Sequence, residues 1–396
     1  MAQGAPVRMG ILGGNRGGCV DQVSGPLQGK IMLAAVCDTD EAVLHRWRDD
    51  RPDVKTYDRY EDMLGSGEID AVFIATPPAL HARQAVEALQ ADLHVLSEVY
   101  AASTVDECWH LVETVRDTGK VYMMAENYCY TRPNMMVLNM MQCGAMGEPT
   151  YAEGAYIHDC RALMFDESGE LTWRGRSKTN PLQGNWYPTH SLGPVAQWLS
   201  VNRGARLLDT ATFVTRPEGA WRFAADRMGA DHPLASPGRM ASGDSATTVI
   251  TTQRGCVIVL RVDTSSPRPH NMTHYALQGT RGSYLSERWH GEAPLVWLEE
   301  HSPGRSPDGS AQWQPLWELA HEFEHPRWRA EGDVAESAGH GGGDYFVLAD
   351  FVDAILEGRD PPIDVYDAVT WSSIVPLSIE SVSLGGEPLN VPRFKA

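Results

Sequence analysis

A tyrosine and a histidine three positions apart, Tyr187 and His190, are the side chains of this sequence best suited to moving protons. A phenol and an imidazole can take and return the proton of a hydroxyl group near neutral pH. At this spacing the two side chains project from one side of a helical turn, and Pro188 at a first helical position would pre-set that turn. We therefore predict that Tyr187 and His190 are catalytic. The alternative is a packing aromatic beside a structural histidine.

The string "HEFEH" at 321–325 satisfies the H-E-x-x-H pattern of zinc metallopeptidases. Zinc binding would need His321 and His325 one turn apart on the same helix. Pro326 follows at once, which predicts that the helix ends there. No downstream Gly-x-x-His completes the longer version of the motif. We therefore predict no metal site in this segment.

A glycine-rich segment, "GGNRGG" at 13–18, is a candidate nucleotide-binding loop. It follows an apolar run and opens a helix-like stretch, where glycines let the backbone approach a pyrophosphate and a helix N-terminus favours its charge. The pattern is imperfect, because an asparagine stands where the middle glycine of G-x-G-x-x-G is expected. An aspartate at the end of the next apolar run supports it, since an acid there binds the adenosine ribose and prefers NAD. The predicted cofactor contacts of this region are Gly13, Asn15, Arg16, Gly17 and Asp38.

The elements that would position these residues change character near residue 128. Before it, short apolar runs alternate with helical patterns, which is typical of a parallel sheet built from βαβ units. One of these helices is predicted by a capping box of Thr104 and Glu107. The predicted strands are 7–14, 31–38, 71–78, 94–98 and 121–127.

Later segments predict a different kind of sheet. "ATTVITTQRGCVIVLRVDTSS" (246–266) and "HYALQGTRGSYLSE" (274–287) each indicate an antiparallel hairpin, and 344–359 has helical spacing with a glycine stop. We predict an α/β fold with two domains. Residues 1–127 form a doubly wound Rossmann sheet. Residues 128–396 form an α/β domain with a large, open, mainly antiparallel sheet and a C-terminal helix that returns to the first domain.

Composition restricts the partners. The 396 residues carry a net charge of −19, which argues against nucleic acid as a partner. No apolar run reaches the length of a membrane span, and the N-terminus lacks the pattern of a secretion signal. Seven cysteines without pair spacing fit reduced, mostly buried thiols. We expect a cytoplasmic protein that acts on a small molecule.

Four motifs of the N-terminal part, "AAVCD", "EIDAVFIATPPALHARQAVEAL", "HVLSE" and "TGKVYMMAENYCY", together resemble the Gfo/Idh/MocA oxidoreductases. With "HGGGDYFVLADFVDAI" near the C-terminal end, the resemblance covers essentially the whole chain. It implies an NAD cofactor and homodimers or homotetramers formed through the open sheet. It also implies further cofactor contacts near the nicotinamide ribose, at Pro78, His81, Glu98, Val99 and Asn127.

One departure from that family concerns its Glu-Lys-Pro motif, whose lysine helps to carry the proton in hydride transfer. Here the three positions are Glu98, Val99 and Tyr100. A valine relays no proton, so the role of the lysine must be filled elsewhere. Tyr100 in place of the proline has no explanation in the sequence.

A closer resemblance lies in the second half, where five motifs look like glycoside hydrolase family 109, the NAD-dependent α-N-acetylgalactosaminidases. That family likewise lacks the lysine and has Glu-Val. The motifs are "AYIHD" (155–159), "WRGRSK" (173–178), "NWYPTHSLGPVAQW" (185–198), "SSPRPH" (265–270) and "EHPRW" (324–328). The predicted substrate contacts are Tyr156, His158, Arg161, Arg174 and His270.

The resemblance implies hydrolysis through transient oxidation at sugar carbon 3, elimination of the aglycone, addition of water and re-reduction. His270 replaces a sugar-facing tyrosine of the family, and Arg161, Arg174, Arg176 and Lys178 could clamp an anion. We therefore expect a small α-glycoside, first a sulfoquinovoside as in the related NAD-dependent sulfoquinovosidases, next an α-N-acetylgalactosaminide. Two alternatives are an NAD-dependent sugar dehydrogenase without glycosidic cleavage and an NAD-bound sensor without catalysis.

Overall fold

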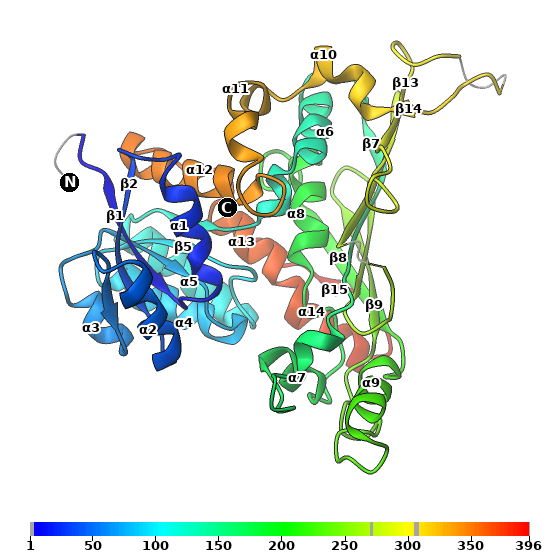
Figure 1. The fold of residues 1–396 in the computed structure, drawn as a ribbon. Coiled ribbons are helices and arrows are strands. Elements are labelled where there is room, and N and C mark those ends of the chain that lie inside the picture. Colours follow the sequence, from blue (N-terminus) through cyan, green and yellow to red (C-terminus); the bar gives the residue numbers. More distant parts are fainter. Residues whose placement is uncertain (1–3, 270–271, 305–308, 396) are drawn as a thin grey trace. The chain divides into compact units, whose positions relative to one another are not determined.

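The computed structural model describes residues 4–269, 272–304 and 309–395, and its contacts divide the chain into two compact units (Figure 1). The first unit combines Met1–Arg132 with Pro326–Ser373 and Phe394–Ala396. The second unit contains Pro133–His325 and Ile374–Arg393. All seven cysteines are free and six of them are buried. Among the helices of the described residues, none is long and apolar enough to cross a membrane.

The first unit is built on a six-stranded parallel sheet with the order β3-β2-β1-β4-β5-β6, which confirms the predicted Rossmann sheet. Its strands are mostly buried because helices cover both faces. The strands are β1 (Val7–Leu12), β2 (Ile31–Cys37), β3 (Lys55–Tyr57), β4 (Ala71–Ile74), β5 (His94–Ser97) and β6 (Tyr122–Met124).

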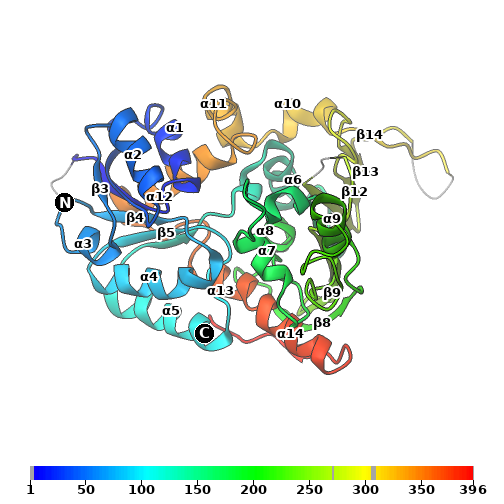
Figure 2. The same ribbon diagram turned by 60° about the horizontal axis from the view of Figure 1, so that its bottom comes forward.

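The helices of this unit come from two distant parts of the chain. From the N-terminal part they are η1 (Arg16–Gly18), α1 (Cys19–Ser24), α2 (Glu41–Asp50), α3 (Tyr60–Leu64), η2 (Pro78–Leu80), α4 (His81–Gln90), α5 (Val105–Thr118) and η3 (Asn127–Tyr130). From the C-terminal part they are α11 (Pro326–Ala335), α12 (Gly343–Glu357) and α13 (Val365–Ser372). Helices α4 and α5 lie side by side (Figure 2).

Local sequence signals set several boundaries of these elements. The capping box of Thr104 and Glu107 opens α5, and Gly358 ends α12 in a left-handed conformation, both as predicted. Strand β4 ends at Ile74, four residues before the end of the apolar run. Pro77 and Pro78 follow, and proline donates no hydrogen bond to a strand ladder, so the chain turns there into η2.

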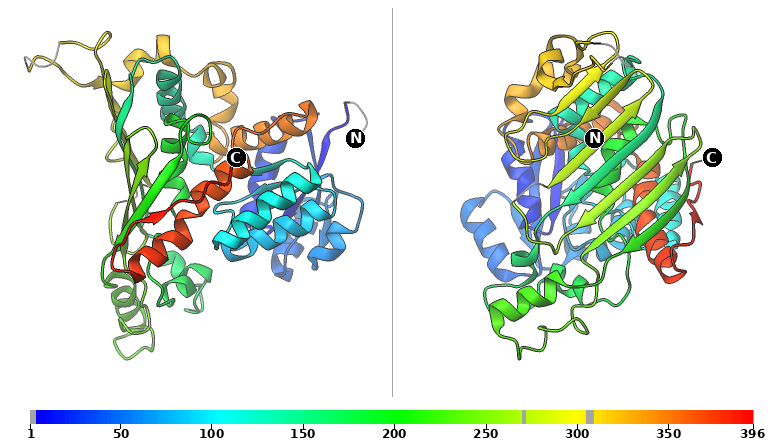
Figure 3. Two further views of the ribbon diagram at one scale, coloured as in Figure 1. Left: turned by 180° about the vertical axis from the view of Figure 1, so that it is seen from behind. Right: turned by 90° about the vertical axis from the view of Figure 1, so that its right-hand side faces the viewer.

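The second unit is built on a nine-stranded sheet with the order β14-β13-β12-β11-β7-β10-β9-β8-β15 (Figure 3). Both predicted hairpins are present, as β9–β10 and β11–β12. The sheet is antiparallel except where β7 pairs with β10. The strands are β7 (Pro149–Ile157), β8 (Leu207–Val214), β9 (Ser245–Thr252), β10 (Val257–Asp263), β11 (Thr273–Gly279), β12 (Gly282–Leu285), β13 (Leu295–Leu298), β14 (Gln314–Pro315) and β15 (Leu389–Asn390).

Helices α8 and α14 pack on one face of this sheet. Burial alternates along β10, since Ile258 and Leu260 are buried while Val257 and Val259 are partly exposed. This alternation shows that one face of the sheet is covered and the other is open. The helices of the unit are α6 (Arg132–Gln142), η4 (Arg161–Met164), α7 (Trp173–Lys178), α8 (Thr189–Trp198), α9 (Gly219–Met228), η5 (Leu316–Leu319), α10 (Ala320–Phe323) and α14 (Ile374–Ser383).

Candidate functional site

The glycine-rich loop lies between β1 and η1 and depends on two of its glycines. Gly13 has a φ of +97°, and a Cβ atom there would lie 2.6 Å from the carbonyl oxygen of Ala75. A Cβ atom at Gly17 would lie 2.2 Å from Cγ2 of Ile11. Only glycine therefore fits these positions, and the loop turns tightly at the carboxyl end of β1, where a Rossmann sheet binds a pyrophosphate.

Asp38 follows β2 and is hydrogen-bonded to the same loop. Its Oδ2 atom accepts from the backbone N–H of Gly14 at 2.8 Å, and its Oδ1 atom accepts from the N–H of Asp40 at 2.9 Å. Asn15, the residue in place of the middle glycine, is exposed, and its Oδ1 atom accepts from Arg46 at 2.7 Å. The carboxylate is thus fixed at the position from which an acid binds the adenosine ribose of a dinucleotide in this fold.

The other half of the sheet also places a buried polar side chain, that of Asn127, near the carboxyl ends of the strands. Asn127 follows β6 and is 4% exposed, and its Oδ1 atom has no hydrogen-bond partner among the described residues. A buried acceptor without a donor is costly, so this oxygen is available to a donor on a ligand or a water molecule. The tight glycine loop and the fixed carboxylate of Asp38 fit the diphosphate and the adenosine ribose of NAD, and Asn127 leaves an acceptor open at the other half of the sheet.

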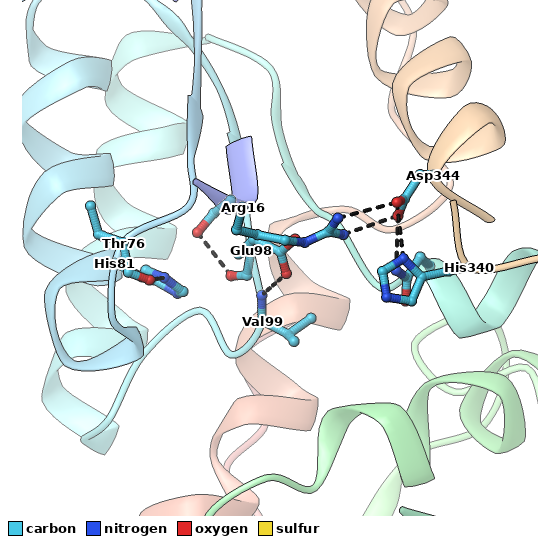
Figure 4. A network of polar contacts seen from close by, with 9 residues as sticks. Arg16, Thr76, His81, Glu98, Val99, His340 and Asp344 are labelled. Carbon is cyan, nitrogen blue, oxygen red and sulfur yellow. Dashed lines mark hydrogen bonds and ion pairs between the residues drawn. The ribbon is translucent and has the colours of Figure 1, made fainter. Parts of the chain in front are cut away.

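Arg16 is the centre of an ion network that joins four segments of the first unit (Figure 4). Its Nε atom donates to Glu98 at 2.6 Å, and its two terminal nitrogens bind the carboxylate of Asp344 at 3.0 and 3.1 Å. Asp344 also accepts from Asn127 at 2.9 Å and lies 2.9 Å from Nδ1 of His340. Burial works to raise the pKa of Asp344, but the hydrogen bonds from His340 and Arg16 hold it well below its ordinary value.

His81, predicted to contact the cofactor, lies against the loop that carries Val99. The ring is 1% exposed, and its two nitrogens lie 2.8 Å from the carbonyl oxygen of Tyr100 and 2.7 Å from that of Thr76. Both nitrogens therefore face backbone carbonyl oxygens, and a neutral ring can donate to only one of them at a time. Val99 is also buried, and Pro78, the first residue of η2, is buried beside His81. The peptide bond between Val99 and Tyr100 is cis.

The second unit gathers four of the predicted residues into one aromatic cluster, which we call the Tyr–His cluster: Tyr156, His158, Tyr187 and His190. The ring of Tyr156 is central, because its centroid lies 5.0 Å from that of His190, 5.3 Å from that of Tyr187 and 5.8 Å from that of His158. The Tyr156 hydroxyl lies 3.0 Å from Nδ1 of His158. Two phenols and two imidazoles therefore meet at one place, as proton transfer requires.

The predicted geometry of Tyr187 and His190 is corrected in one respect. Helix α8 begins at Thr189, so Tyr187 precedes the helix and Pro188 is its cap residue rather than its first residue. The centroids of the two rings are still 5.1 Å apart. The loop before α8, and not a helical turn, therefore sets the position of Tyr187.

Four hydrogen bonds, three of them buried, hold that loop and the start of α8. Asn185 accepts from the N–H of Tyr187 at 3.4 Å and donates to Thr248 of β9 at 3.2 Å. Its own N–H donates to Ser378 of α14 at 2.7 Å. The hydroxyl of Tyr275 on β11 donates to the carbonyl oxygen of His190 at 2.6 Å. Sheet and helices thus fix both ends of the segment that carries the two predicted catalytic residues.

Gly154 of β7 brings α8 against the strand that carries Tyr156. A Cβ atom at Gly154 would lie 1.9 Å from the carbonyl oxygen of Ser191. Gly154 and Tyr156 are two residues apart on the strand and share a face of the sheet. The close approach of helix and strand therefore places His190 next to Tyr156.

The four basic residues considered as an anion clamp have different environments. Arg161 binds both oxygens of Asp159 at 2.8 Å. The guanidinium of Arg174 lies 4.3 Å from the ring centroid of Trp173, and the exposed Arg176 donates to the carbonyl oxygen of Leu171. Lys178 is buried, its amine donates to the carbonyl oxygen of Gly243 at 3.4 Å, and burial lowers its pKa. These contacts remove the physical ground for a four-residue clamp.

Two further predictions concern His270 and the "HEFEH" segment at 321–325. His270, a predicted sugar contact, lies outside the described residues. In the "HEFEH" segment, α10 ends at Phe323 and α11 begins at Pro326, so His321 and His325 share no helix. Within the described ranges, no group of three or more His, Cys, Asp or Glu side chains could hold a metal ion.

Sequence reasoning assigned no role to Asp344, His340, Gly154, Asn185 or Tyr275. Asp344 and His340 stand in the quoted "HGGGDYFVLADFVDAI" motif, where an acid after three glycines in the first turn of a helix was a usable signal. Gly154 interrupts a strand of larger residues, which often marks a close backbone approach. Nothing in the local sequence points to Asn185 or Tyr275, because their partners lie on other elements.

Comparison with known proteins agrees with both units. Residues 7–126 match the family model described as oxidoreductase family, NAD-binding Rossmann fold, and residues 130–396 match glycosyl hydrolase 109, C-terminal domain. A glycosyl hydrolase family 109 protein of Stenotrophomonas maltophilia (strain K279a) is 34% identical over all of this chain and 90% of its own length. A protein of Tannerella forsythia named alpha-N-acetylgalactosaminidase is 34% identical over 98% of this chain and 86% of its own length.

Solved structures share the fold. Levoglucosan dehydrogenase in complex with NADH and L-sorbose superimposes with a TM-score of 0.77 at 20% identity, covering 98% of this chain and all of that one. An oxidoreductase domain protein from Kribbella flavida gives a TM-score of 0.76 at 18% identity with the same coverage. From the two family models and the full-length relatives, the chain belongs to glycosyl hydrolase family 109, with an NAD-binding Rossmann domain at its N-terminus.

Proposed function

We propose that this protein hydrolyses a small α-glycoside through transient oxidation of sugar carbon 3, elimination of the aglycone, addition of water and re-reduction. The observation that carries the proposal is the Tyr–His cluster in a chain of family 109. Paired carboxylates at a fixed separation, which most glycosidases use, are replaced here by phenols and imidazoles. Groups of this kind suit proton removal from carbon and oxygen better than protonation of a leaving group alone.

NAD, when bound to the Rossmann domain, supplies hydride chemistry at sugar carbon 3. The chain supplies the proton transfers. His190 is our proposed base for the hydroxyl of carbon 3, because its imidazole lies within the cluster and its carbonyl oxygen is held by Tyr275. A ketone at carbon 3 acidifies the hydrogen on carbon 2, and a phenolate can then remove that hydrogen.

Tyr187 and Tyr156 are the two candidates for that second base. The sequence favoured Tyr187. The contact of the Tyr156 hydroxyl with His158 supports the other choice, since an adjacent imidazole can take the phenol proton and ready the oxygen for carbon 2. We expect that Tyr156→Phe lowers exchange of the carbon 2 hydrogen roughly 10²-fold or more, while Tyr187→Phe retains most of it. Solvent-deuterium exchange followed by NMR measures both variants, and the reverse order would assign the role to Tyr187.

For the sugar, we now favour an α-N-acetylgalactosaminide over a sulfoquinovoside. The T. forsythia relative carries the name of that activity. The main physical reason for a sulfonated sugar was the four-residue clamp. In the structure Arg161 is neutralised by Asp159, and the amine of Lys178 is buried against a backbone carbonyl. Arg174 stays a candidate for contact with a neutral sugar.

We also propose further copies of this chain as its partners. The face of the nine-stranded sheet opposite α8 and α14 carries Val249, Val257 and Val259, all partly exposed. A broad sheet face with apolar side chains supports self-association into a dimer or tetramer. The seven free cysteines support a reducing compartment such as the cytoplasm.

The activity test uses p-nitrophenyl α-N-acetylgalactosaminide and a p-nitrophenyl sulfoquinovoside, each with a catalytic amount of NAD. We expect release of nitrophenol without accumulation of NADH, together with loss of deuterium from sugar carbon 2 during turnover. Stoichiometric NADH without release would show a sugar dehydrogenase. Neither signal over a broad panel of glycosides would favour an NAD-bound sensor. Release with full retention of the carbon 2 label would exclude elimination.

A further inference from the structure

Two carboxylates in the first unit share a single guanidinium. Glu98 and Asp344 are bound by Arg16 through different nitrogens, at 2.6 Å and 3.0 Å (Figure 4). The side chains of Glu98 and Asp344 are only 13% and 5% exposed. Water therefore screens these charges weakly, and their sum matters to any charged group placed beside them.

The sum of the charges in this network is negative. Glu98 and Asp344 contribute two negative charges and Arg16 contributes one positive charge. The other groups that touch the carboxylates, the N–H of Val99 and the amide of Asn127, are neutral. Burial lowers the pKa of His81, the nearby imidazole whose ring nitrogens face the carbonyl oxygens of Thr76 and Tyr100. The imidazole of His340 lies 2.9 Å from Asp344, and Glu98, Asp344 and Arg16 by themselves leave one negative charge in excess.

The topology places this excess charge at the nicotinamide half of the cofactor site. Glu98 directly follows β5 and Asn127 follows β6, so both stand at the carboxyl ends of the second half of the Rossmann sheet. In this fold the pyrophosphate binds at the turn after β1, and the second half of the sheet takes the second mononucleotide. The nicotinamide ring carries a positive charge in NAD⁺ and none in NADH.

We propose that the network of Glu98, Asp344 and Arg16 biases the bound cofactor toward its oxidised form. The excess negative charge attracts the cationic ring of NAD⁺ and gives no such attraction to NADH. The inference rests on the proposed function for its purpose, because a redox-neutral glycosidase must begin each turnover with NAD⁺. It also gives the missing lysine a physical meaning. A lysine at position 99 would bring the network to neutrality, and Val99 keeps it negative.

The experiment measures the ratio of NAD⁺ to NADH on the protein in the absence of sugar. Protein loaded with either form is incubated with an equimolar mixture of both until the two preparations reach the same bound composition. Free cofactor is then removed, and the bound fraction reduced is read from the absorbance of the reduced nicotinamide. We expect Glu98→Gln to lower the bound NAD⁺ to NADH ratio by about tenfold, and Asp344→Asn to shift it in the same direction.

The matched control is Asp353→Asn, since Asp353 lies on the same helix as Asp344 but pairs with the exposed Lys30. It should leave the ratio within twofold of the unmodified protein. If Asp344→Asn does not fold, Val99→Lys against Val99→Met tests the charge by addition, and only the lysine should lower the ratio. A change under twofold for Glu98→Gln, or a rise in the ratio, would overturn the inference. Because no sugar is present, this result is independent of whether the protein cleaves glycosides.

Discussion

Replacement of His190 by asparagine is expected to lower kcat for glycoside cleavage by roughly 10²- to 10⁴-fold. His190 is 8% exposed, and its ring contacts those of Tyr156 and Tyr187 at 5.0 and 5.1 Å. Asparagine keeps a polar side chain in the cluster but cannot accept a proton from a sugar hydroxyl. Because the first chemical step is then blocked, exchange of the carbon 2 hydrogen should fall together with aglycone release, while KM changes little.

His301→Asn is the matched control for this variant. His301 belongs to the same unit and lies in the segment between β13 and β14. Its Nε2 atom lies 3.2 Å from the carboxylate of Glu322 on α10. Its loss should leave kcat unchanged. Far-ultraviolet circular dichroism and the melting temperature of both variants should stay close to those of the unmodified protein. If His190→Asn kept more than about a tenth of the original kcat, His190 could not be the general base.

Substitution of Gly154 by alanine is expected to damage the same site through the backbone. The added methyl group would lie 1.9 Å from the carbonyl oxygen of Ser191, so α8 and β7 must separate. Overpacking of this kind costs roughly 1–3 kcal/mol of unfolding free energy. The shift also carries His190 away from Tyr156, and a displacement of about 1 Å can lower the rate of a positioned reaction about 10²-fold. Denaturant unfolding and steady-state kinetics measure the two effects.

Gly238→Ala provides the comparison. Gly238 is exposed, and a Cβ atom there meets no heavy atom within 4 Å. This substitution should be neutral or slightly stabilising, by up to about 1 kcal/mol, since it restricts the unfolded chain. An alanine at position 154 that unfolds like the parent and keeps full activity would show that the helix does not need its close contact with β7.

The sequence predicted the parts of the fold that depend on local pattern. Buried apolar runs predicted five strands of the six-stranded sheet, and the Arg-Gly turn after Thr252 predicted the hairpin of β9 and β10. Strand β3 was not predicted, because its three residues are exposed or only partly buried. Where a run continued into Pro77, the predicted strand was too long, because apolarity alone does not show where strand hydrogen bonding stops. The parallel pairing of β7 with β10 was not predicted, since strands so far apart in sequence leave no local signal.

The candidate site was predicted only in part, again because contacts between distant elements leave no local signal in the sequence. Residues named by motif, such as Tyr156 and His190, meet in the structure. The predicted clamp rested on closeness in sequence, and the structure directs Lys178 into the interior and Arg161 to its neighbour Asp159. The residues that hold the site, Tyr275 above all, act through contacts between elements that only the folded chain brings together.

The return of the chain to its first unit has a consequence for biosynthesis. Helix α12 is buried along nearly its whole length, and its Asp344 completes the network around Arg16. Residues 326–373 leave the ribosome only after residues 133–325, the larger part of the second unit and nearly two hundred residues long, have been made. At typical elongation speeds this delay is roughly 10–40 s. During that time the nascent Rossmann sheet exposes the apolar surface that α12 later covers, so chaperone binding to the N-terminal segment should be longest in this interval.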